Sequence, residues 1–147
     1  KLGANSGKGK VLQVVRTYVA NSSAITTTST SDSASGIQAS ITPTASGNLI
    51  LVDYVSTMTD SGVDCHAKMY QKIGSASIAP MASASHFHVG YTDVNHTRYA
   101  PFTFSGSYTA TSTDTLLYEP YIKVSSGTGT LVHVNSSYGL TLTEVEQ

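Results

Sequence analysis

Hydrophobic and polar residues alternate over short segments of this chain, and no segment keeps the 3.6-residue period of an amphipathic helix. The most apolar window is residues 39–57, ASITPTASGNLILVDYVST. Its core, Leu49 to Val55, is too short for an ordinary helix and rich in β-branched and aromatic residues, so it predicts a central strand. Apolar residues fall on both faces of that strand, so we expect one face to be covered by a second sheet and the other by a neighbour or a subunit.

The same pattern predicts further strands before and after this central one. They are Val11 to Val19, Ile37 to Ile41, Cys65 to Ile73, His86 to Val94, Phe102 to Tyr108, Leu116 to Val124, Thr130 to Val134 and Tyr138 to Val145, while the Thr- and Ser-rich residues 24–35 form an edge strand or a loop. In the first strand Leu12 and Val14 share one face, and Val11 and Val15 share the other. Pro120 places its strand near an edge or a bulge.

Eight to ten short strands separated by turn residues predict an all-β fold, an antiparallel β-sandwich of the jelly-roll type. We expect residues 1–10 to be a flexible lead-in or linker from an upstream region, because they are polar and rich in glycine. Residues 11–147 then form a single β-sandwich domain, which is long enough to bury a core.

Composition narrows the classes of function. Ser and Thr together number 42, against only eight Lys and Arg and nine Asp and Glu, a composition typical of extracellular or virion surfaces. The net charge of −1 gives no attraction to nucleic acid. No window approaches the roughly 18 apolar residues of a membrane span, so we expect no membrane insertion. The lone Cys65 excludes an internal disulfide, which leaves the core or oligomerisation to stabilise the fold.

Three stretches carry a resemblance to a known group of proteins. They are GKVLQVVRT (Gly9 to Thr17), SITPTASGNLILV (Ser40 to Val52) and SSYGLTLTEVEQ (Ser136 to Gln147), and FTFSGSYTATSTDTLLYEPYIKV (Phe102 to Val124) is similar to the long hairpin of the same group. Together they resemble the C-terminal jelly-roll domains of tail-fibre-like virion proteins from marine and other environmental phages. The resemblance spans nearly the whole chain after Lys10 and implies a structural protein of the virion that attaches to the host surface.

By analogy with other fibre tips, the resemblance also implies a homotrimer that contacts other virion proteins and a host-surface glycan or protein. A capsid decoration or head-fibre protein and a cellular carbohydrate-binding module are the two alternatives.

Catalytic and metal chemistry find little support in the sequence. His86 and His88 place two imidazoles on one face of a strand, which would suit a metal only around a three-fold axis; two exposed polar positions are the simpler interpretation. Glu119, Glu144 and Glu146 could pair as glycosidase carboxylates, although the last two more simply solvate the final strand. No G-x-S-x-G motif is present. We therefore expect no enzymatic activity and no cofactor.

The loop DVNHTRYAP, Asp93 to Pro101, is the predicted receptor-binding surface. It brings Asn95, His96, Arg98 and Tyr99 together in a chain where charge is scarce, with Tyr91 at its base. Arg98 can pair with an acidic group and Tyr99 can stack on a sugar ring. An ordinary exposed connection is the simpler interpretation of this loop. The stretch from Gly74 to Ser85 is the next candidate.

Overall fold

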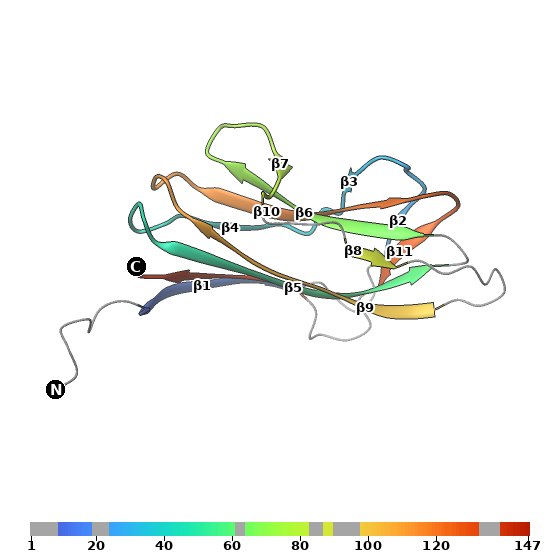
Figure 1. Ribbon diagram of the computed structural model, residues 1–147, viewed down its shortest axis with the longest axis horizontal. Helices are drawn as coiled ribbons and strands as arrows, with labels where there is room; N and C mark the ends of the chain where they lie inside the picture. Colours follow the sequence, from blue (N-terminus) through green and yellow to red (C-terminus); the bar gives the residue numbers. More distant parts are fainter. Residues whose placement is uncertain (1–8, 19–23, 61–63, 83–86, 90–97, 133–138) are drawn as a thin grey trace.

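The computed structural model describes residues 9–18, 24–60, 64–82, 87–89, 98–132 and 139–147. These residues form two antiparallel sheets packed face to face (Figure 1), which confirms the predicted all-β sandwich. The strands are β1 (Val11–Tyr18), β2 (Ile25–Thr27), β3 (Ser33–Ala34), β4 (Ala39–Ile41), β5 (Leu49–Asp60), β6 (Cys65–Ile73), β7 (Ala79–Pro80), β8 (Phe87–Val89), β9 (Arg98–Thr109), β10 (Leu116–Val124), β11 (Gly129–Val132) and β12 (Gly139–Val145). Within these ranges there is no helix long and apolar enough to cross a membrane.

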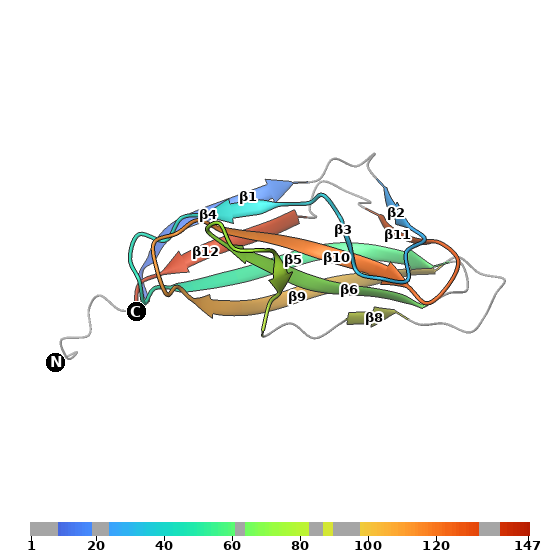
Figure 2. The same cartoon turned by 90° about the horizontal axis from the view of Figure 1, so that it is seen from above.

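The first sheet contains β1, β2, β5, β9, β11 and β12, with β5 at its centre. Strands β12 and β11 pair with the same edge of β5, one after the other along its length, so they lie end to end on one line. Beyond them, β1 pairs with β12 and β2 pairs with β11, which places β1 and β2 on a second common line. The other edge of β5 pairs with β9 along its whole length. Figure 2 shows β1, β12, β5 and β9 side by side in this order.

The second sheet is built in the same way around β10 and β6, which pair along their full length. Strands β3 and β4 lie along the outer edge of β10, and β7 and β8 lie along the outer edge of β6. When strands that follow one another along the same line are counted together, the twelve strands of the described residues form eight lines. In chain order the lines are β1 with β2, β3 with β4, β5, β6, β7 with β8, β9, β10, and β11 with β12. Taken in chain order, the first line pairs with the eighth, the second with the seventh, the third with the sixth and the fourth with the fifth. This nested pairing is the jelly-roll arrangement that the spacing of strands predicts.

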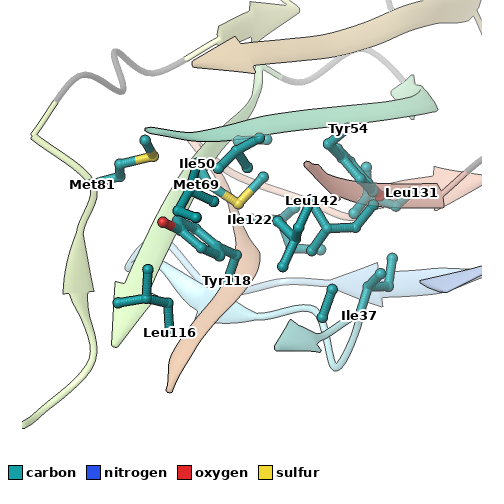
Figure 3. Packing of buried hydrophobic residues seen from close by; sticks show 14 of the residues in the cluster. Ile37, Ile50, Tyr54, Met69, Met81, Leu116, Tyr118, Ile122, Leu131 and Leu142 are labelled. Atoms are coloured by element: carbon teal, nitrogen blue, oxygen red, sulfur yellow. The ribbon is translucent and has the colours of Figure 1, made fainter. Parts of the chain in front are cut away.

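A single hydrophobic core fills the space between the sheets (Figure 3). The alternation predicted for Cys65 to Ile73 is confirmed, because β6 has the same bounds and Cys65, Ala67 and Met69 are buried. Gly129 allows the sheets to approach closely. A Cβ atom at this position would lie 2.6 Å from Cγ1 of Val124 and would also collide with Sγ of Cys65, both on the second sheet.

Two details of the strands differ from expectation. The register of β1 shifts between Val11 and Gln13, which is the mark of a β-bulge. Because of this shift Val11 and Val14 lie on the same outer face, where strict alternation would separate them. The chain is also hydrogen-bonded to the sheet before β1 begins, within the predicted flexible lead-in of residues 1–10. The Gly9 amide donates to the Glu146 carbonyl at 2.7 Å.

Strand β10 is not itself an edge strand, but it lies next to the edge line that β3 and β4 form, near an edge as Pro120 predicts. The Pro120 carbonyl accepts a hydrogen bond from the amide of Ser35, which lies between β3 and β4. The backbone of Pro120 therefore faces the gap in the neighbouring line, where its missing N–H interrupts no ladder bond.

Candidate functional site

The outer faces of the two sheets differ in chemistry. Among the described side chains, the large hydrophobic ones that remain exposed all lie on the outer face of the first sheet: Val11 (54%), Val14 (58%), Tyr18 (60%) and Val55 (40%). Leu49 and Leu51 of β5 lie on the same face and are half-buried. We call this surface the apolar face. Arg16 and Asp53 are exposed at outward positions of the same strands, so charged groups interrupt the apolar ones. Exposed hydrophobic side chains gathered on one sheet are typical of a surface that contacts another protein.

The outer face of the second sheet carries charge and aromatic rings instead. Lys68 and Lys72 of β6 alternate there with Tyr70, whose ring stacks on that of Tyr121 at 3.9 Å between centroids. The Tyr70 hydroxyl donates to the Asp32 carboxylate at 2.7 Å, and Lys123 lies 3.9 Å from the same carboxylate. Burial, and then the charge of Asp32, raise the pKa of Tyr70 to about 12, so this stack stays neutral at physiological pH.

A hollow of about 650 Å³ opens on this polar face. In Figure 1 the loop between β6 and β7 and the chain around β3 rise above the second sheet. The hollow is lined by Ala34, Gln38, Lys72, Ser75, Ala76, Ser77, Ile78, Leu117, Glu119 and Tyr121. One wall is formed by residues 75–78. They belong to the stretch from Gly74 to Ser85, which is the second predicted recognition region. The same stretch also contains β7 and the buried Met81.

Glu119 is the most deeply placed charged group of the hollow, with only 2% of its surface exposed. One carboxylate oxygen accepts from the Gly36 amide at 2.7 Å, and the other accepts from Nε2 of Gln38 at 2.8 Å. The backbone carbonyl of Gln38 is held in turn by the Thr17 hydroxyl at 2.8 Å. The carboxylate is therefore fixed in position beneath the surface of the hollow and in turn orients the exposed Gln38 amide.

Lys72 and Tyr121 add a cation and a phenol to the same hollow. Within the described part of the chain no ion pair forms at Lys72, so its ammonium group is available to a ligand. Burial, and then the negative charge of Glu119, raise the pKa of Tyr121, which therefore stays protonated. The lining as a whole carries one positive and one negative side chain, together with serine hydroxyls and an apolar floor of Leu117 and Ile78.

The residues predicted for recognition from the sequence are only partly placed. Tyr91, Asn95 and His96 lie outside the described residues. Arg98 and Tyr99 belong to β9, where their backbones pair with Asp60 and Thr59, so this end of the predicted loop is strand.

The predicted metal ligands are also only partly placed. His86 lies outside the described residues, whereas His88 is in β8 and pairs with His66 across the ladder. The described residues contain no group of three His, Cys, Asp or Glu side chains that could hold a metal ion.

Glu144 does not solvate the last strand, as its position near the C-terminus suggested, but is fully buried between the sheets. Its Oε1 accepts from the Thr44 amide (2.7 Å), the Thr44 hydroxyl (2.8 Å) and Nδ2 of Asn48 (2.7 Å), and its Oε2 accepts from Nε2 of Gln13 (2.6 Å). Burial alone would raise the pKa of Glu144, but these donors hold it below its usual value. All of these donors belong to the chain itself, so this carboxylate stabilises the fold.

Comparisons with known proteins add little to this geometry. No family model and no curated protein matches the sequence. Among solved structures, one described as the structure of Eiger TNF from S. frugiperda is similar, with 8% identity and a TM-score of 0.43 over 75% of this chain and 85% of that chain. At this identity and score the likeness implies nothing about what the present chain binds or does.

Proposed function

We propose that this chain is a non-enzymatic structural domain of a phage virion, placed at the tip of a tail fibre or spike, where it attaches the particle to a host-surface molecule. The observation that supports this proposal is the contrast between the two outer faces of the sandwich. One face carries the exposed large hydrophobic side chains and is suited to contact with other protein chains, and the other is polar and hollowed. The virion setting itself comes from the sequence resemblance.

The apolar face is the part that would join copies of the chain into a homotrimer. Exposed Val11, Val14 and Val55 lose contact with water when a second protein surface covers them, and burial of apolar area is the main driving force of such association. Other virion proteins are the remaining partners that we propose.

Attachment would use the polar face, the chain that leads into β9, or both. Arg98 and Tyr99 remain proposed contact residues together with Tyr91, Asn95 and His96. The hollow is a second contact region, and it lies on the face opposite to the apolar one.

Adsorption of labelled, purified protein to a panel of bacterial strains tests the proposal. We expect saturable adsorption to a subset of strains and none to empty capsids. Replacing Arg98 and Tyr99 together with Ala should weaken adsorption at least about tenfold, equivalent to about 1.4 kcal/mol, with an unchanged melting temperature. Binding to capsids instead of cells would favour the capsid-decoration alternative.

A carbohydrate-binding module is the second candidate function, and the hollow around Glu119 and Tyr121 is the observation that favours it. A module of this kind would bind glycans as a monomer and would not need the apolar face to be covered.

A further inference from the structure

We infer that the hollow beside Glu119 is a binding site for a neutral sugar unit of a surface glycan. This inference rests on the proposed function and gives it a ligand class and a place. The hollow has a volume of about 650 Å³ and lies largely open to solvent between the second sheet and the loop that follows β6. A ligand held there keeps part of its surface in water, which suits one or two sugar rings of a longer glycan.

The exposed amide of Gln38 is the first element of recognition, and the buried carboxylate of Glu119 holds it in position. Glu119 is 2% exposed and accepts from the Gly36 amide at 2.7 Å and from Nε2 of Gln38 at 2.8 Å. A ligand in the hollow therefore meets the Gln38 amide and not the carboxylate itself. A side-chain amide can both donate hydrogen bonds to sugar hydroxyls and accept them.

Lys72 supplies the complementary donors. Its outward position on β6 lies opposite Leu117, one step along the face from the pair of Tyr70 and Glu119. An ammonium group donates hydrogen bonds, which sugar hydroxyls can accept. The Ser75 and Ser77 hydroxyls extend the same chemistry along the rim.

The charge of the lining favours a neutral ligand over an acidic one. Glu119 and Lys72 cancel, so the hollow offers no net positive charge to an anion. A uronate or sulfate group would also have to enter beside a carboxylate that is already desolvated, at a cost that Lys72 alone offsets only in part. Leu117, Ile78 and the Tyr121 ring supply apolar surface for the C–H face of a sugar.

Titration calorimetry with neutral trisaccharides of glucose, galactose and mannose, and with trigalacturonate as the acidic probe, tests the inference. We expect at least one neutral probe to bind the wild-type protein, with an affinity that changes little between low and high salt. Lys72→Met should weaken that binding at least tenfold. Ala76→Trp, which fills the hollow from an exposed loop position, should do the same.

Lys68→Met is the matched control, because Lys68 lies on the same face of the same strand but does not line the hollow. It should bind as the wild type does. Failure of every neutral probe, preference for trigalacturonate, or unchanged binding by both Lys72→Met and Ala76→Trp would overturn the inference.

The adsorption assay separates this inference from the proposed function. Wild-type protein that adsorbs to cells while all neutral probes fail would leave attachment standing and place it elsewhere on the chain. Neutral sugars that bind in the hollow of a protein that adsorbs to no cells would support the inference and contradict the attachment role.

Discussion

Two glutamates show that residue type alone does not predict whether a carboxylate is buried or exposed. Glu144 and Glu119 both lie in strands near the end of the chain, and both are buried. The donors of Glu144 come from β1, 131 residues away in the sequence, and from the segment before β5, 96 to 100 residues away. Those of Glu119 come from residues 36 and 38. Such partners are set by the pairing of distant strands, which explains why the sequence placed Glu144 in solvent.

Replacing Glu144 with Ala should lower the free energy of unfolding by at least about 2 kcal/mol, because buried donors from Gln13, Thr44 and Asn48 lose their acceptor. Glu146→Gln, two residues further along, is the control and should change it by no more than about 0.5 kcal/mol. Urea denaturation at neutral pH measures both. Equal stability of the two variants would mean that the buried carboxylate contributes nothing.

The depressed pKa of Glu144 also predicts how stability depends on pH. A group whose pKa is lower in the folded state stabilises the fold fully above its unfolded pKa, near 4.5, and loses that contribution as pH falls through the folded pKa. The stability difference between wild type and Glu144→Gln should therefore shrink as pH falls below about 4.5. A difference that stays constant from pH 7 to pH 3 would argue against this.

At the scale of elements, strand existence was predictable because alternation of side chains marks a half-buried sheet directly. The bounds of β6 and the buried positions of residues 37–41 follow from that pattern. The bulge in β1 and the gap between β3 and β4 opposite Pro120 do not, because each depends on the register of a partner strand. The hollow could not be predicted for the same reason, since it joins β3, β6, β10 and a loop.

Strand β5 offers a sharp test of the two faces of the first sheet. Val52 is fully buried, whereas its neighbour Leu51 is half-buried on the apolar face. With Leu51 on the outer face, we expect the single chain to fold and assembly to be lost. Val52→Asp should instead unfold the domain, because it buries a carboxylate without a partner at a cost of about 3 kcal/mol or more.

Circular dichroism and light scattering distinguish the two variants. Leu51→Asp should keep a cooperative melt and scatter as a smaller particle than the wild type. If it assembles as the wild type does, the apolar face is not the contact surface.

Over the whole molecule, the nested pairing of eight strand lines leaves each sheet with one face in the core and one outside. Because the core is shared, the two outer faces are free to differ. One carries the exposed large hydrophobic side chains, and the other holds Lys68, Lys72, Lys123 and the hollow. We expect light scattering of the wild-type protein at micromolar concentration to give three times the mass of the chain. A stable monomer would contradict the homotrimer.

The most direct test of the attachment role is an electron cryomicroscopy map of the particle that carries this chain. The account predicts groups of three copies at the distal end of a fibre or spike, with the apolar faces turned toward one another and the hollows turned outward. Copies spread over the capsid, or hollows buried against other virion proteins, would contradict it.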